Sequence, residues 1–162
     1  MGLELELTLN EVTNAERKLG FRLAMSGSDK EEYMYRLEQS NAFAGKILSS
    51  PFTRIDTEII YKERWISSVG YCLPVTQFFA KQCENIQRPC INPVVAKMEF
   101  NLHFPRAVVF GPKKYQGKHI DDYGVQQYLS HLERFVVYLH QDGKLGDLIR
   151  IQMDQHQQVI GS

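Results

Sequence analysis

Hydrophobic residues alternate with polar ones at the start of the chain. Residues 3–9 place a leucine at every second position, which is the pattern of a half-buried β-strand. Residues 10–16 are polar and are expected to form a turn, and residues 18–25 follow as a second strand with apolar side chains on one face. Gly20 marks a point in this strand where the backbone can approach another chain closely. The pattern predicts a short β-hairpin over residues 1–27.

After the hairpin, apolar residues recur at the helical spacing. Ser28 and Glu31 match the capping-box pattern, in which Ser28 is the N-cap and Glu31 lies three residues on. Pro51 is expected to end the helix that follows. The apolar face of this helix consists of Met34, Leu37, Ala44 and either Ile47 or Leu48.

Two further helices are expected before residue 98. One runs over residues 54–69, and its predicted apolar face consists of Ile55, Ile59, Ile66 and Val69. Thr76 is the expected N-cap of the next helix, which Pro89 and Pro93 should break or kink because proline lacks the N–H that a helix interior needs. The large aromatic residues Trp65, Phe78 and Phe79 are expected in the core.

The C-terminal part of the chain returns to a helical pattern. Asp121 or Asp122 can cap a helix that ends near Gly143, and Gly143 suits a left-handed C-terminal cap. The apolar face of this helix consists of Val125, Tyr128, Leu129, Leu132, Val136 and Leu139. A last helix follows with Leu145, Leu148, Ile149 and Met153.

These elements predict a mainly α (α+β) fold with about five helices and a short N-terminal β-hairpin. We expect four segments along the chain. They are the hairpin at 1–27, a helical region at 28–98, an irregular basic connector at 99–120 and a C-terminal helical pair at 121–162.

Composition places the chain among ordinary globular proteins. It has 162 residues, of which 43% are hydrophobic and 23% charged, and its formal net charge is zero. A neutral chain carries no overall attraction to nucleic acid or to a membrane surface. No secretory signal or apolar run of membrane-spanning length is present, so we expect an intracellular protein, in cytoplasm or nucleus, without a membrane partner.

The three cysteines are irregularly spaced. Their odd number and their spacing favour reduced, buried thiols over a disulfide framework. A zinc site from Cys83, Cys90 and His103 matches no C-x2-C pattern, and buried, inert thiols are the favoured interpretation. We therefore predict neither a metal nor another cofactor.

Charge is uneven along the chain despite its neutral total. Residues 88–118 hold six lysines and arginines against one glutamate, a local charge of +5. The aromatic residues Phe104, Phe110 and Tyr115 are interleaved with these charges. Basic side chains on phosphates, with aromatic rings stacked on bases, are how proteins bind a nucleic-acid strand without reading its sequence. A solvated loop whose aromatic side chains pack into the core explains the same pattern, and both interpretations stay open.

Several blocks in order along the chain resemble one family. They are the run Ile-Ser-Ser-Val-Gly-Tyr-Cys-Leu-Pro-Val-Thr at 66–76, Cys-Glu-Asn-Ile-Gln at 83–87, Lys-Met at 97–98, Pro-Arg-Ala-Val-Val-Phe-Gly-Pro at 105–112 and Tyr-Gln-Gly at 115–117. Together they resemble the segment that follows the reverse transcriptase palm in retrotransposon polyproteins. The run Lys-Leu-Gly-Phe-Arg-Leu at 18–23 is similar to the Leu-Gly hairpin that grips the primer end in that family. The resemblance covers about residues 15–162.

The resemblance implies a thumb-like role without catalysis. Polymerase chemistry needs carboxylates that hold two metal ions, and this motif belongs before the Leu-Gly hairpin, where no such pair is recognised. The pair Asp121-Asp122 is interpreted as a helix cap instead. On its own the chain is thus expected to have no catalytic residue, and its implied partners are an RNA or DNA template–primer duplex and a reverse transcriptase palm domain.

The residues implied in nucleic-acid binding come from the hairpin and the connector. They are Lys18, Leu19, Gly20, Arg106, Lys113, Lys114, Tyr115 and Lys118. The alternative is a helical interaction module, derived from a retroelement, that has no role in nucleic-acid binding. The neutral net charge favours this alternative, because selection for phosphate contacts would leave a basic excess.

Overall fold

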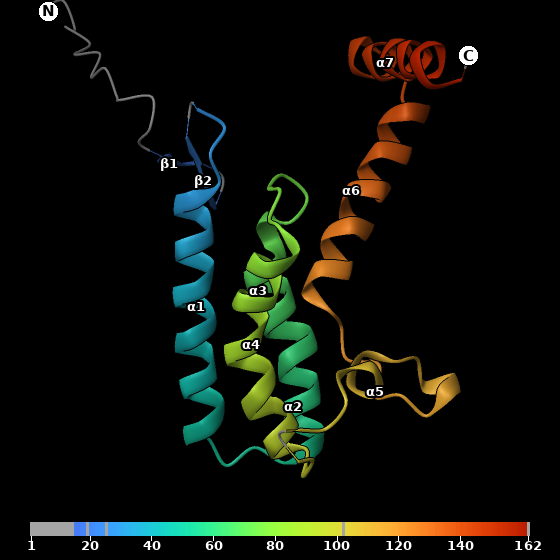
Figure 1. Cartoon of the computed structure of the whole chain (residues 1–162). Helices are drawn as coiled ribbons and strands as arrows, with labels where there is room; N and C mark the ends of the chain where they lie inside the picture. Colours follow the sequence, from blue (N-terminus) through green and yellow to red (C-terminus); the bar gives the residue numbers. More distant parts are fainter. Residues whose placement is uncertain (1–14, 19, 25, 102, 162) are drawn as a thin grey trace, which may run out of the picture.

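Helices dominate the part of the chain that the structure describes. This computed structural model describes residues 15–161, without positions 19, 25 and 102 (Figure 1). The mainly α fold is confirmed, and the predicted strand over residues 3–9 lies outside the described residues. The elements are β1 (Ala15–Lys18), β2 (Phe21–Ala24), α1 (Lys30–Ser49), α2 (Arg54–Ile60), a π-helical segment (Tyr61–Ile66), α3 (Ser67–Val69), a 3-10 turn (Gly70–Cys72), α4 (Ala80–Lys97), α5 (Arg106–Phe110), a second 3-10 turn (Lys113–Tyr115), α6 (Tyr123–His140) and α7 (Lys144–Ile160).

The hairpin is present, but its turn lies elsewhere. β1 pairs antiparallel with β2, from Ala15 opposite Ala24 to Lys18 opposite Phe21. Gly20 therefore lies in the turn between the two strands, and the predicted turn over residues 10–16 was wrong where it overlaps β1. Gly20 has a φ of +92°, a backbone conformation that a tight hairpin turn needs and that glycine adopts freely.

α1 begins and ends close to its predicted limits, with a different cap. Ser28 is not the N-cap: the N-cap is Asp29, and the Ser28 hydroxyl only accepts a 3.4 Å bond from the N–H of Lys30. The Asp29 carboxylate accepts a 2.8 Å bond from the N–H of Gln77, which ties the start of α1 to the chain before α4. The helix stops at Ser49, before Pro51 as predicted.

α2, the π-helical segment and α3 form one continuous rod. Thr53 and Asp56 make a reciprocal capping box at its start. The predicted apolar face was wrong in its first half, because Ile55 and Ile59 are 70% and 53% exposed. The buried positions lie at steps of four residues and are Thr57, Tyr61, Trp65 and Val69. Burying two large aromatic rings removes more apolar surface from water than burying two isoleucines, so the aromatic face is turned inward.

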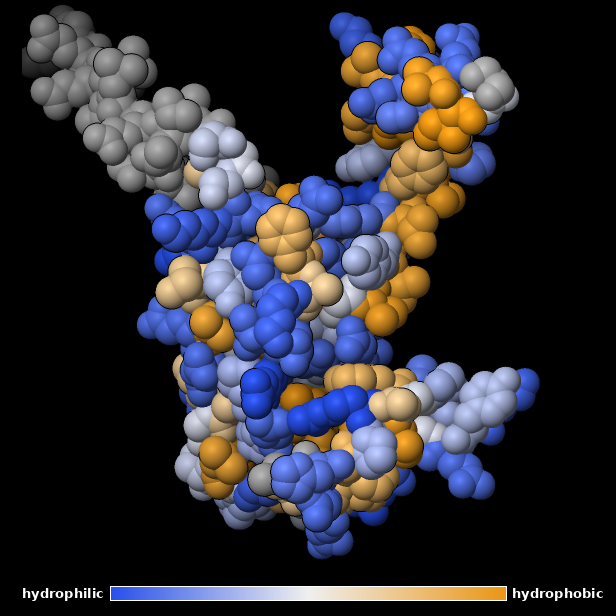
Figure 2. Space-filling model, in the orientation of Figure 1, coloured by the Kyte–Doolittle hydropathy of each residue, from blue (hydrophilic) through white to orange (hydrophobic). Residues whose placement is uncertain are grey.

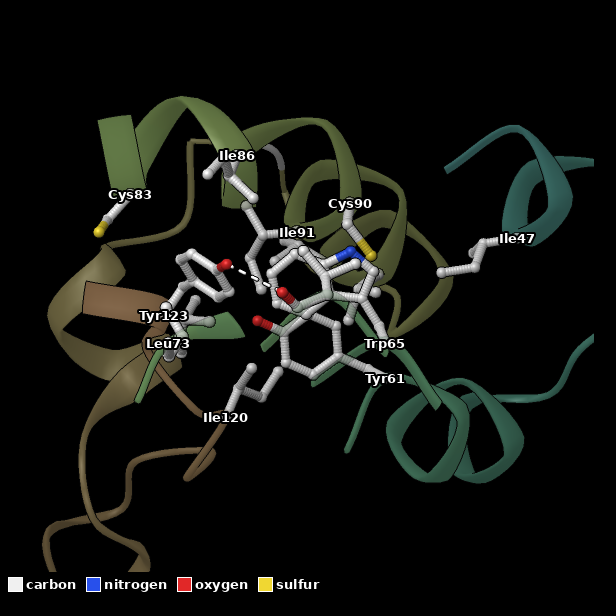
Figure 3. Packing of buried hydrophobic residues seen from close by; sticks show 14 of the residues in the cluster. Ile47, Tyr61, Trp65, Leu73, Cys83, Ile86, Cys90, Ile91, Ile120 and Tyr123 are labelled. Atoms are coloured by element: carbon white, nitrogen blue, oxygen red, sulfur yellow. Dashed lines mark hydrogen bonds between the residues drawn. The ribbon is translucent and has the colours of Figure 1, made fainter. Parts of the chain in front are cut away.

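The core forms around these rings, between the rod, α1, α4 and the start of α6. Trp65 stacks on Tyr61 with ring centroids 4.9 Å apart and contacts Tyr123 at 5.5 Å (Figure 3). Trp65 and Phe78 are buried as predicted, whereas the prediction for Phe79 was wrong, since its side chain is 76% exposed.

α4 runs through both prolines that were expected to break it. Its N-cap is Phe79 rather than Thr76, and the side chain of Gln82 accepts the Phe79 N–H at 2.9 Å. An interior proline costs about 3 kcal/mol, whereas each large apolar side chain that is buried contributes about 1.5–3 kcal/mol. The apolar side chains that α4 buries therefore outweigh its two prolines; they are Cys83, Ile86, Cys90, Ile91, Val94 and Val95.

The two C-terminal helices leave the body as an arm (Figure 1). α6 is capped by Asp122, whose carboxylate accepts the N–H of Val125 at 3.0 Å, as predicted for this aspartate pair. α6 ends at His140, before the expected position. Gly143 has a positive φ of +136° but serves as N-cap of α7 rather than as the left-handed cap of α6.

Candidate nucleic-acid interface

The predicted nucleic-acid-binding residues fall into two groups at opposite ends of the helical body (Figure 1). One group is the hairpin at the start of α1, and the other is the connector around α5. α1 alone has 20 residues and spans roughly 30 Å at 1.5 Å per residue. The structure therefore does not bring the two groups into one site.

In the hairpin group, Gly20 has a structural role. Its carbonyl oxygen accepts a 3.2 Å bond from Nη2 of Arg36, and a Cβ at this position would lie 3.1 Å from the ring of Tyr71. Close packing against the helices therefore requires a glycine here. Leu19 and the side chain of Lys18 lie outside the described residues.

Arg106 lies at the start of α5 and points back to α4. Its Nη2 donates a 2.6 Å hydrogen bond to Oδ1 of Asn92. Its Nη1 is buried without a partner among the residues that the structure describes. An unpaired buried donor costs about 1–3 kcal/mol. Arg106 therefore joins α5 to α4 and offers little of its guanidinium to a ligand at the surface.

A cavity of about 480 Å³ opens beside Arg106, between α4, α5 and the start of α6. Its acidic residues are already engaged: Glu84 pairs with Lys81 at 2.8 Å, and Asp122 caps α6. Arg88 is exposed at the rim. The remaining walls are mostly apolar and include Phe78, Ile91, Phe110, Val125 and Tyr128.

The side chain of Lys118 packs against the connector itself. Its Nζ lies 4.8 Å from the centre of the Phe100 ring, and the guanidinium of Arg54 lies 5.2 Å from the same ring. Phe100 in turn stacks on Phe104 with centroids 4.7 Å apart. Two cations on one ring hold the connector against the start of α2.

Lys113, Lys114 and Tyr115 form the 3-10 turn that points into solvent. Tyr115 is 74% exposed, and Nζ of Lys114 lies 5.6 Å from the centre of its ring. The pKa of Glu58 is lowered chiefly by the hydrogen bond from Lys62, and the charge of Lys113 adds to the effect. This turn is the part of the predicted set that is free to meet a strand, with two positive charges and an open aromatic face.

The connector presents this turn on an ordered backbone. The N–H groups of Lys118, His119 and Ile120 donate to the carbonyls of Val108, Gly111 and Val109, at 2.9, 2.9 and 3.1 Å. Gly117 packs so closely on Gly111 that a Cβ would collide with its carbonyl oxygen. The turn is therefore held in place by backbone bonds rather than left as a loose loop.

The cysteines are buried thiols. Burial raises the pKa of Cys72 and of Cys90, and it raises the pKa of Cys83 to about 11, with the negative charge of Asp122 adding to the effect. Within the described ranges, no group of three or more His, Cys, Asp or Glu side chains is placed to hold a metal ion. No helix among the described residues combines the length and the apolar character needed to cross a bilayer.

Sequence reasoning missed which face of α6 would turn inward. Gln127 is buried because its amide exchanges hydrogen bonds of 3.0 and 2.9 Å with the backbone of Phe78, and His131 bonds the carbonyl of Leu73 at 2.8 Å. The apolar stripe therefore faces outward, where Figure 2 shows hydrophobic residues gathered along α6 and α7. The amphipathic pattern signals an apolar face but not the direction in which that face points.

Comparison with protein-family models, curated proteins and solved structures gives no match to this chain. The resemblance to the reverse transcriptase segment stays a prediction that depends on the sequence blocks alone.

Proposed function

We propose that the chain is a non-catalytic strand-holding module, of the kind that follows the palm in retroelement reverse transcriptases. The exposed turn of Lys113, Lys114 and Tyr115 carries this proposal. It projects two cations and an aromatic ring that is 74% exposed from an ordered connector. In this role the turn binds the backbone and one base of a template–primer duplex, while a palm domain elsewhere supplies the catalytic carboxylates.

Binding through this turn has a measurable salt dependence. Each phosphate that a lysine neutralises adds about 0.7–0.9 to the slope of log affinity against log salt concentration. Stacking of one base on an aromatic ring contributes about 1–3 kcal/mol. The full chain should therefore bind a labelled RNA–DNA hybrid with an affinity that falls as the salt concentration is raised.

The test compares two double lysine variants by fluorescence anisotropy at several salt concentrations. K113A/K114A should lower the affinity and flatten the salt slope by about 1.4–1.8, whereas K30A/K144A, with two exposed lysines away from this turn, should keep both. Y115A should weaken binding about equally at all salt concentrations. An affinity that does not change with salt concentration, or that falls equally in both double variants, would disprove a role for the turn.

A second candidate is a helical interaction module without a nucleic-acid role. The outward stripe of α6 favours it, because exposed apolar helix faces mark protein contact sites. Variants of the stripe separate the two candidates: replacing Leu132, which is 58% exposed, should change protein association and leave affinity for the hybrid unchanged.

A further inference from the structure

α6 is oriented with its polar face inward. Tyr123 and Gln127 are 0% and 3% exposed, and His131 follows them toward the body at the same four-residue step. The opposite face carries Val125, Leu129, Leu132 and Val136, which are 53%, 52%, 58% and 50% exposed. α6 therefore buries a glutamine and leaves an apolar face without a partner among the residues that the structure describes.

The outward residues form a seam suited to another helix. Val125, Leu132 and the partly buried Leu139 recur every seven residues, and Tyr128 and Phe135 occupy the intermediate positions. This spacing repeats over two heptads, which is the pattern of helices that pack side by side. A flat or irregular partner surface would not require it.

The exposed area is that of a stable interface. α7 adds its own outward apolar residues, and the two helices are joined at a tight corner where Arg150 donates a 3.0 Å bond to the carbonyl of Leu139. On α6 alone, six such side chains, each exposing on the order of 100 Å², offer about 600 Å² per partner, which reaches the lower end of the roughly 1,200 Å² in total that a specific interface buries. They are Val125, Tyr128, Leu129, Leu132, Phe135 and Val136.

The net charge of α6 indicates which kind of partner its apolar face can bind. Its charged residues are Glu133 and Arg134, which cancel each other and lie outside the seam. A neutral helix has no attraction to nucleic acid or to an anionic membrane surface, both of which demand basic residues beside the apolar face. A neutral helix also does not repel a copy of itself.

We propose that the seam of α6 pairs with α6 of a second copy of this chain, antiparallel, about a two-fold axis at Leu132. In this register Val125 meets Leu139, Leu129 meets Phe135, and Leu132 meets its own copy. Every seam position then faces an apolar residue, which is the self-complementarity that a two-fold interface requires. The proposal builds on the interaction-module candidate and is independent of nucleic-acid binding.

The same pairing uses the cavity between α4 and α6. The end of one α6 lies beside Val125 and Tyr128 of the other, and both residues line the cavity of about 480 Å³. The corner between α6 and α7 of the second copy thus meets a largely apolar recess. Dimerisation should therefore reduce the exposure of Tyr128.

The first test measures mass by light scattering and by sedimentation of the full chain, across roughly two orders of magnitude in concentration. The natural chain should be a dimer. L132E places two carboxylates at the axis and should weaken dimerisation about 100-fold or more. V137E is the matched control, because Val137 is 56% exposed on α6 but outside the seam, and this variant should remain dimeric. Circular dichroism identifies any variant that fails to fold, and L129R then replaces it as the seam variant.

The second test fixes the orientation by oxidative cross-linking. The native thiols Cys72, Cys83 and Cys90 are buried, so an introduced surface cysteine reacts selectively. L132C should cross-link to its own copy, V125C alone should not, and V125C mixed with L139C should. A monomeric natural chain at all concentrations, equal loss in V137E, or self-cross-linking of V125C would overturn the proposal. A chain that stays monomeric but binds a separate palm domain through α6 would overturn it as well.

Discussion

Arg36 and Glu32 form a buried ion pair one turn apart on α1, with Nε of Arg36 2.6 Å from Oε1 of Glu32. Their side chains are 3% and 0% exposed. Oε2 of Glu32 accepts the N–H of Arg22 at 2.7 Å, and Nη1 of Arg36 donates to the carbonyl of Ser68 at 2.9 Å. The pair thus joins the hairpin, α1 and α3.

Removing one member of this pair should destabilise the fold. R36A leaves the carboxylate of Glu32 buried without its cation, which costs about 3–5 kcal/mol in comparable pairs. Urea titration should show this loss in the free energy of unfolding. R64A, at an exposed position of the π-helical segment, is the control and should stay within about 0.5 kcal/mol of the natural chain. A loss in R36A no larger than in R64A would contradict this role.

The same pair shows where sequence reasoning stops. Glu58 and Lys62 have the spacing of Glu32 and Arg36, yet their side chains are 25–30% exposed and form an ordinary surface pair. Spacing along a helix predicts that two charges can meet, but only the neighbouring elements decide whether water reaches them. Burial of a charged pair is therefore invisible in the sequence.

Local signals predicted only part of the local structure, because Ser28, Thr76 and Gly143 do not form the caps that the sequence indicated. Pro51 ends α1 and Asp122 caps α6, because both effects depend on residues within one turn. The position of the hairpin turn, the course of α4 through Pro89 and the outward face of α6 depend on tertiary packing, and these were missed. In the candidate site, the local excess of basic residues indicated the connector. The hydrogen bond of Arg106 and the cation–π contact of Lys118 that hold these side chains in the fold involve residues distant in sequence.

Buried thiols should react slowly. Because the pKa of Cys83 is raised to about 11, roughly one in a thousand of its thiols is ionised at pH 8, and the thiolate is the reactive form. A chromogenic disulfide reagent should label the folded chain slowly. In urea the same reagent should label all three cysteines rapidly. Rapid labelling of the folded chain would show that these side chains are accessible.

Stability should fall in alkaline solution. Burial raises the pKa of all three cysteines in the folded chain, whereas in the unfolded chain they ionise near the ordinary value of 9.0. Above that pH the unfolded chain releases protons that the folded chain keeps, so the free energy of unfolding decreases as pH rises from 9 toward 11. Burial also raises the pKa of Tyr61 and of Tyr123, which acts in the same direction above pH 10. Urea titrations at pH 8 and pH 10.5 test this, and C83A should show a smaller decrease than the natural chain.

Gly117 should be irreplaceable in the connector. A Cβ there collides with the backbone of Gly111, which cannot move without breaking the bonds that order the turn of Lys113 to Tyr115. G117A should therefore lower stability and raise the protease sensitivity of the connector. G45A is the matched control, because a Cβ at Gly45 in α1 meets open space, and alanine there should stabilise the helix by about 1 kcal/mol. Equal behaviour of the two variants would argue against a packed connector.

Pro89 should be a position where the chain can be stabilised. It lies inside α4, is only partly buried, and denies the carbonyl of Asn85 its helical hydrogen bond. P89A restores this donor without removing a fully buried side chain, so it should raise the free energy of unfolding by about 1–3 kcal/mol. P93A is the informative comparison, because Pro93 is buried and its removal opens space in the core, which offsets the restored bond. Thermal and urea unfolding of both variants measure the difference. A destabilised P89A would mean that α4 depends on this proline rather than tolerating it.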